Sequence, residues 1–154
     1  MQKMKTIVLS DGEFTVRQLD GMTGALLLPQ VVALVGPAFE KMLPMLRKFM
    51  AAPDPEKVEV DIGEAIMGLT EACRAANPDL LKRVVTELLS TATVDGVELK
   101  VKLPVLFQGK PFDFYRLVWF ALMLNYSRFF NDAVAQLGHL SAAKKASGST
   151  SPTT

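Results

Sequence analysis

The chain has 154 residues, 49% of them hydrophobic, and a formal net charge of +1. This length suits a single domain with one core, and the balanced charge argues against a nucleic-acid-binding domain, which carries a basic stripe. The single cysteine, Cys73, has no partner for an intrachain disulfide, and the basic start lacks the apolar run of a signal peptide, so we expect a cytoplasmic protein.

The first predicted element is a β-hairpin over residues 4–19. Asp11-Gly12 separates two apolar stretches, and Asp-Gly is a favoured pair for a two-residue type I′ turn. Strand alternation places Phe14 and Val16 together on one face of this hairpin.

Residues 20–52 predict two or three helical pieces, because Pro29, Pro37 and Pro44 interrupt a region that is otherwise apolar. The clearest break is Gly36-Pro37, since glycine ends helices and proline begins them.

Two more helices are predicted on either side of residue 77. Asp61 and Glu64 have the spacing of a capping box at the start of the first helix. Asn77 is placed to cap the second helix, with Pro78 at its first position. Leucine and valine pairs between residues 80 and 89 give that helix a wide apolar stripe.

Asp95-Gly96 predicts a second hairpin, between residues 93–94 and 97–101. Each hairpin alone would be marginally stable, so we expect the two to pair into one small sheet with helices over one face. The predicted fold is therefore α+β and mostly helical, with a helical bundle and a long C-terminal helix. The residues expected to share a face of the second hairpin are Val97, Leu99 and Val101.

The last predicted helix spans residues 112–138 and is apolar almost all the way round from residue 117 to residue 124. A surface helix has one apolar stripe, so this helix is either the central core element or carries a second apolar face for a partner. Its uncharged run between Arg116 and Arg128 is far short of the ~20 residues of a membrane span. We expect one domain over residues 1–139 and a disordered polar tail over residues 140–154.

Two groups of apolar side chains are candidates for binding another protein, and the alternative for both is burial in the chain's own core. One face of the last helix is rich in aromatic residues, whereas Phe114, Leu117 and Leu124 trace a second face that we expect to pack inward. Met42 and Met45 belong to a methionine-rich segment, and methionine clusters suit adaptable binding surfaces. The predicted partner-binding residues are Phe112, Tyr115, Trp119, Met123, Tyr126, Phe130, Met42 and Met45.

No residue pattern predicts catalysis. His139 follows the end of the last predicted helix, where a cation suits the helix dipole, and Cys73 lies on an apolar stripe. The acidic residues between positions 54 and 64 match no EF-hand spacing, and a solvated loop with a helix cap explains them. We therefore predict no catalytic, metal-binding or cofactor-binding residues, no cofactor, and a protein that is not an enzyme.

Three short motifs give the chain a resemblance to the small tail assembly chaperones of long-tailed phages and related prophage elements. The similar region covers roughly residues 4–137. In that family an Asn followed by an aromatic residue and then Phe-Phe commonly ends the last helix. The motifs are the opening hairpin over residues 7–21, the turn region over residues 93–99, and Asn125-Tyr126-Ser127-Arg128-Phe129-Phe130.

The resemblance implies a non-enzymatic protein in the cytoplasm of an infected or induced bacterial host. Such a protein binds the long tape-measure protein, keeps it soluble, helps to recruit tail-tube subunits, and is absent from the finished tail. The alternative is a small self-associating or peripheral membrane regulatory protein. A lipid-surface helix should be rich in Lys and Arg on its polar face, and only Arg116 and Arg128 serve here, whereas self-association stays open.

Overall fold

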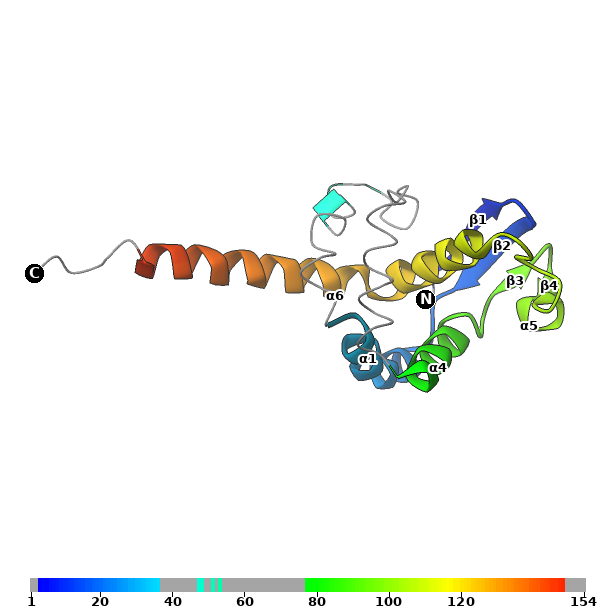
Figure 1. Cartoon of the computed structure of the whole chain (residues 1–154), viewed down its shortest axis with the longest axis horizontal. Helices are drawn as coiled ribbons and strands as arrows, with labels where there is room; N and C mark the ends of the chain where they lie inside the picture. The colour runs from blue at the N-terminus through cyan, green and yellow to red at the C-terminus, as the bar shows by residue number, and fades with distance from the viewer. Residues whose placement is uncertain (1–2, 37–46, 49–50, 52, 54–76, 149–154) are drawn as a thin grey trace, which may run out of the picture.

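The computed structural model of the chain describes residues 3–36, 47–48, 51, 53 and 77–148, with side chains along the last helix up to Gln136. Within these residues the fold is α+β and mostly helical, as predicted (Figure 1). The elements are β1 (Met4–Leu9), β2 (Gly12–Arg17), α1 (Gly21–Val35), α4 (Pro78–Leu88), β3 (Thr93–Val94), β4 (Val97–Glu98), α5 (Leu99–Lys102) and α6 (Pro111–Gly148).

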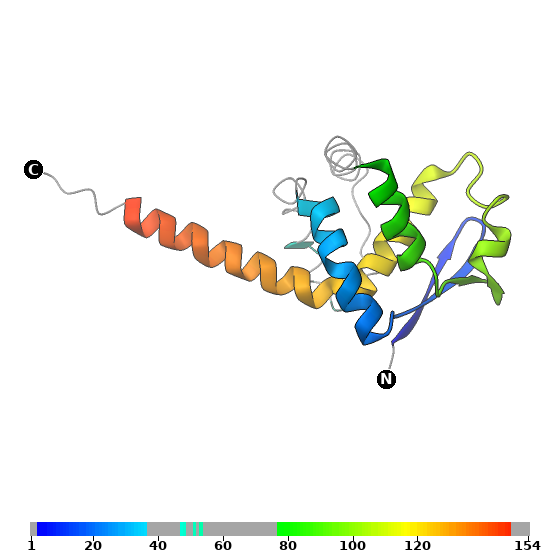
Figure 2. The same ribbon diagram turned by 90° about the horizontal axis from the view of Figure 1, so that it is seen from below.

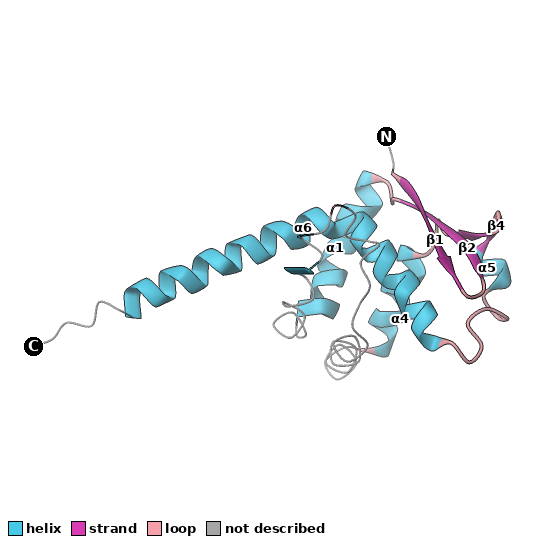
Figure 3. Cartoon of the chain, turned by 90° about the horizontal axis from the view of Figure 1, so that it is seen from above, coloured by secondary structure: helices cyan, strands magenta, loops and turns pink. Residues whose placement is uncertain are grey.

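The two hairpins form one antiparallel sheet in the order β1-β2-β3-β4, which confirms the predicted pairing. The hairpins meet where Phe14 of β2 pairs with Val94 of β3. Phe14 and Val16 are fully buried, whereas Val8 is 73% exposed, so one face of the sheet packs on the core. Figure 3 shows the sheet at one end of the molecule, beside the N-terminal part of α6.

The two hairpin turns differ from each other. In the second hairpin Asp95 and Gly96 have φ values of 48° and 83°, as the predicted type I′ turn requires. In the first hairpin Leu9 pairs with Gly12, so the turn residues are Ser10 and Asp11, one position earlier than predicted.

Gly12 is explained by a close approach between the hairpins. Its φ is +146°, and a Cβ atom there would lie 2.6 Å from Oδ2 of Asp95. The backbone N–H of Glu13 donates to Oδ1 of Asp95 at 3.0 Å, and the N–H of Asp95 donates to the carbonyl of Glu13 at 2.9 Å. The glycine therefore lets the second turn dock on the first hairpin.

The predicted strand over residues 97–101 was wrong beyond Glu98. The chain turns into the short helix α5 at Leu99, which is 3% exposed, while Val101 is 68% exposed. Residues two apart share a face in a strand but point in nearly opposite directions in a helix, so Val97, Leu99 and Val101 do not form one face.

Helix α1 begins at its cap Asp20, whose Oδ1 accepts from the N–H of Thr23 at 2.8 Å. Pro29 lies inside the helix, and Gly36 caps its C-terminal end. After the Gly36-Pro37 break, residues 47–48 and 51 of the predicted helical region are described and are helical. The rest of that region and the helix predicted from Asp61 lie outside the described residues.

Helix α4 begins as predicted, with Asn77 accepting from the N–H of Asp79 at 2.9 Å and Pro78 in the first turn. Its buried residues Val84 and Leu88 face the core. The helix contacts both α1 and α6, and Figure 2 shows α1 and α4 in front of α6 when the molecule is seen from below.

Helix α6 spans 38 residues and begins one residue before the predicted start. It continues to Gly148, so the first part of the tail that we expected to be disordered is helical. That stretch is rich in alanine and lysine, which favour helix without any burial. Figure 1 shows the C-terminal part of α6 extending away from the sheet and the other helices.

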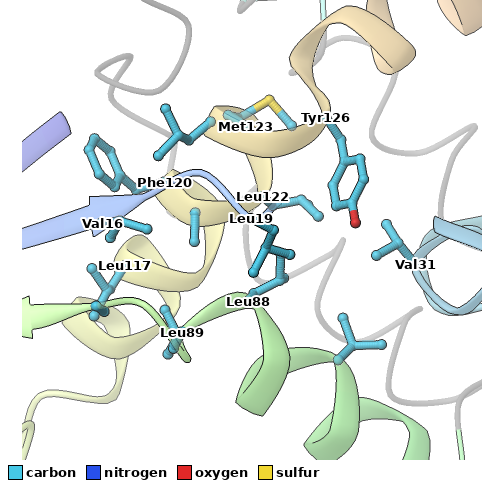
Figure 4. Packing of buried hydrophobic residues seen from close by; sticks show 14 of the residues in the cluster. Val16, Leu19, Val31, Leu88, Leu89, Leu117, Phe120, Leu122, Met123 and Tyr126 are labelled. Carbon is cyan, nitrogen blue, oxygen red and sulfur yellow. The ribbon is translucent and has the colours of Figure 1, made fainter. Parts of the chain in front are cut away.

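The core forms around the middle of α6. All five residues from Phe120 to Leu124 are buried, which is possible only where other elements cover the helix on every side. Figure 4 shows β2, α1 and α4 contributing Val16, Val31 and Leu88 around this part of the helix. At the sheet end, Phe107 stacks on Phe14 with ring centroids 5.5 Å apart and extends the core toward the start of α6.

Candidate partner-binding surface

The structure resolves the choice between a central helix and a two-faced helix for the middle of α6. Met123, Tyr126 and Phe130 are 1%, 6% and 4% exposed, so these three residues of the predicted binding face belong to the chain's own core. The expected division into an inward and an outward face fails here because α6 contacts α4 and β1, and Tyr126 is bonded to Gly24 of α1.

The N-terminal end of the predicted face remains accessible. Phe112 is 44% exposed, and Tyr115 and Trp119 are half-buried. The ring of Tyr115 packs edge-on against Phe114, with centroids 5.5 Å apart. Binding through Phe112, Tyr115 and Trp119 stays a prediction. Met42 and Met45 lie outside the described residues.

A larger exposed apolar surface lies on α1. This helix contains no charged residue from Gly21 to Val35. Its inward side buries Leu27, Val31 and Leu34. Its opposite side, which we call the α1 face, consists of exposed residues that recur at helical spacing: Met22, Ala25, Leu26, Pro29, Val32 and Ala33.

The exposure of the α1 face is unusual for a helix of a small protein. Met22 is 74% exposed, Leu26 67% and Val32 44%. The solvent side of a helix normally carries charged and polar residues, and a contiguous apolar patch there marks an interaction surface. The α1 face is therefore a candidate site for binding another protein.

A pocket of about 450 Å³ adjoins this face where α1 lies against α6. Ala25 belongs to both the pocket wall and the α1 face, so the two surfaces are continuous. We call this cavity the α1–α6 pocket. It is lined by Gln18, Leu19, Asp20, Gly21, Gly24, Ala25, Leu28, Asn125 and Tyr126.

The polar wall of the pocket is fixed by Asn125, which lies in the apolar stretch of α6. Its Oδ1 accepts from the backbone N–H of Leu19 at 2.9 Å, and its Nδ2 donates to the carbonyl of Ala121 at 2.8 Å. Gln18 adds a longer bond from Nε2 to the carbonyl of Leu124, at 3.3 Å. The bonds at Leu19 and Gln18 hold the connection between β2 and α1 against α6.

Tyr126 makes the corresponding link to α1 itself. Its hydroxyl donates to the carbonyl of Gly24 at 2.8 Å, and Figure 4 shows its ring reaching from α6 toward α1. Burial raises the pKa of Tyr126, because the phenolate form would lose its hydration. The hydroxyl therefore remains a hydrogen-bond donor at neutral pH.

The charge at the pocket comes from Asp20. Its carboxylate accepts from both the N–H and the hydroxyl of Thr23, at 2.8 Å and 2.7 Å. These bonds, the backbone one first, hold the pKa of Asp20 below its usual value. The carboxylate is thus ionised at neutral pH and already satisfied as a helix cap.

The arrangement offers contact surface rather than reactive groups. Within the described residues, no three His, Cys, Asp or Glu side chains are grouped as they would be around a metal ion. Among the helices described, a stretch that is both apolar and long enough to span a membrane is absent. What the site presents is an uncharged helix surface beside a pocket with a fixed polar wall.

Sequence reasoning missed the α1 face and the role of Asn125, although each left a signal. Fifteen consecutive residues without charge leave this helix no charged side to expose to water. A lone Asn within an apolar helix must satisfy its amide when it is buried, which indicates a tertiary contact. The partner across that contact, Leu19, could not be identified from the pattern.

Comparison with protein families gives a match over most of the chain. A family described as phage tail assembly chaperone protein, TAC, matches residues 10–140. The match begins in the turn of the first hairpin and ends within α6, so it spans β2, the second hairpin, α1, α4 and the Asn125-Tyr126 motif. No curated protein and no solved structure matches the chain. The family match covers most of the sequence, and the chain belongs to the phage tail assembly chaperone family.

Proposed function

We propose that the chain is a non-enzymatic chaperone that acts in the bacterial host cytoplasm, binds the tape-measure protein of its phage or prophage, and keeps it soluble while tail-tube subunits assemble around it. Membership of the tail assembly chaperone family supports the general role. The observation that carries the specific partner is the α1 face, where Met22 and Leu26 are 74% and 67% exposed on an uncharged helix.

The apolar surfaces of the two proteins would be complementary. A long helical protein that has not yet been enclosed by its tube exposes apolar stripes, and such stripes promote aggregation in water. A small folded protein that presents an apolar helix face can cover these stripes by helix packing. The aromatic start of α6, with the exposed Phe112 and the half-buried Tyr115 and Trp119, is proposed as a second contact region for the same partner.

Co-expression tests this function. The tape-measure protein of the same phage is produced alone, with the wild-type chain, and with a Leu117→Asp variant whose buried charge unfolds the chaperone. We expect soluble tape-measure protein that co-purifies with the wild-type chain and aggregated protein in the other two cases. Equal solubility in all three cases, or soluble tape-measure protein that carries no chaperone, would contradict the proposal.

A further inference from the structure

We infer that the α1 face and the α1–α6 pocket together dock one amphipathic helix of the client protein, through an uncharged apolar stripe and in a contact weak enough to be reversed. This inference rests on the proposed function, and it specifies the surface and the chemistry of the segment that binds there.

The absence of charge on α1 defines the stripe. No charged side chain occurs from Gly21 to Val35, and the carboxylate of Asp20 at the pocket is already bonded to Thr23. Covering the α1 face therefore desolvates no charged side chain of α1, and the one charge at the pocket is the carboxylate of Asp20 at its edge. A client helix that placed Lys, Arg, Asp or Glu on the α1 face would bury a charge without a partner, which is strongly unfavourable. The complementary segment is an uncharged stripe.

The shape of the surface suits a helix. Gly21, Gly24 and Ala25 form the α1 side of the pocket, and a Cβ atom added at Gly21 would meet nothing within 4 Å. Small residues allow two helix backbones to approach closely, while the pocket receives a large apolar side chain against Leu28. The exposed residues Met22 and Leu26 then flank that side chain along the stripe.

The size of the α1 face favours a client helix over a second copy of the chain as the molecule that binds there. A helix of 15 residues is about 22 Å long and roughly 10 Å wide, so one side of it offers about 400 Å² of accessible surface. A stable protein–protein interface buries about 800 Å² on each partner. The α1 face alone is too small to hold a stable homodimer. A contact of this size fits a client that must later be handed to the tail tube.

Methionine-methyl NMR tests the location of the contact without altering the chain. The protein contains 8 Met residues, among which Met22 is 74% exposed on the α1 face and Met4 is 61% exposed on β1. We expect the Met22 methyl signal to shift or broaden between the free chain and its co-purified complex with tape-measure protein. The Met4 signal should stay unchanged. A change at Met4 with none at Met22 would overturn the inference.

Matched variants test the same point by affinity. Leu26→Lys places a charge on the α1 face, and Val101→Lys places one on α5 at nearly the same exposure, 67% against 68%. Met22→Lys and Val8→Lys form a second pair, at 74% and 73%. Because burying an unpaired charge is costly, we expect at least a roughly tenfold loss of binding for the two α1 variants. The two controls should bind as the wild type does.

The outcomes separate this inference from the proposed function. Failure of the wild-type chain to bind tape-measure protein contradicts both. Binding by the wild type that all four lysine variants retain overturns the inference and leaves the function standing. If the wild type sediments as a dimer that only the α1 variants dissociate, while tape-measure binding persists, the occupant of the face is a second copy and the inference is wrong.

Discussion

The side chain of Asn125 accepts a hydrogen bond from the backbone N–H of Leu19 at 2.9 Å, across 106 residues of sequence. This bond joins the middle of α6 to the connection between β2 and α1. It sets where α1 begins relative to the core, and thereby which side of α1 is exposed. The Asn-aromatic motif, one of the three that carry the family resemblance, is thus a structural link beneath the candidate surface.

Replacing Asn125 by Ala should destabilise the fold. The change leaves the N–H of Leu19 without its partner in a partly buried site, which costs about 1–3 kcal/mol. Urea unfolding measures the loss. Asn131→Ala, at an exposed position on α6, is the control and should change the free energy of unfolding by less than about 0.5 kcal/mol. Equal effects of the two changes would refute the role of the link.

Met123→Ala should behave as a core truncation. The side chain is 1% exposed, so its removal leaves a cavity and should cost about 2–5 kcal/mol. Met4→Ala, at a position that is 61% exposed, serves as the control and should be nearly neutral. Thermal melts of both variants check the prediction, and a stable Met123→Ala variant would show that the predicted outward face of α6 is free after all.

Gly12→Ala should weaken the docking of the two hairpins. The new Cβ atom would lie 2.6 Å from Oδ2 of Asp95, at a φ of +146° that L residues rarely adopt. Gly21→Ala is the matched control, because it meets nothing within 4 Å and lies in the first turn of α1, where Ala favours helix. The prediction is a lower denaturation midpoint for Gly12→Ala alone; comparable midpoints for the two variants would contradict it.

Asp11 should make stability depend on pH in the acid range. Its carboxylate binds Lys110 Nζ and the N–H of Phe107, each at 2.7 Å, and these bonds, the one to Lys110 first, lower the pKa of Asp11 from 3.8. A lowered pKa stabilises the folded chain above pH 3.8, and this contribution is lost as the pH falls through the folded-state pKa. Asp11→Asn should therefore be less stable than the wild type at pH 7.

The difference between Asp11→Asn and the wild type should shrink as the pH falls below 3.8, because the carboxyl of the unfolded chain is protonated there first and that of the folded chain at lower pH. Denaturant unfolding at pH 7 and pH 3 measures this change. The exposed residue Asp132 supplies the control, since Asp132→Asn should match the wild type at both values. A gap that is constant with pH would rule out the ion pair as its source.

The parts of the fold that could be predicted are those set by local backbone chemistry. Asp95-Gly96 supplies two residues that tolerate positive φ, and Asn77-Pro78 supplies a cap followed by a residue that needs no N–H partner. Both act within a few residues of themselves. The predicted length of the strand after Gly96 was wrong, because β4 pairs over only two residues. Residues 97–101 carry no signal that separates a short strand from a helical turn.

The candidate site was predictable only in part, because exposure is a tertiary property. An all-apolar helix such as the middle of α6 suits a central position and a partner-binding face equally well, and only the placement of α1, α4 and the sheet decides for Met123. The uncharged sequence of α1 gives the opposite case. It resembles a buried helix, and its exposure at Leu26 becomes visible only when the neighbouring elements are in place.

The most direct test of the account uses the phage or prophage that encodes the chain. Production of the chaperone is stopped by an early nonsense codon, and the soluble tape-measure protein and the tailed particles are then counted after induction. Without the chaperone we expect insoluble tape-measure protein and particles that lack tails. The wild-type chain and the Val101→Lys variant, supplied separately, should restore tails, whereas Leu26→Lys should not. The finished tails should contain no chaperone. Normal tails in the absence of the chain, or the chain as a stable component of finished tails, would contradict it.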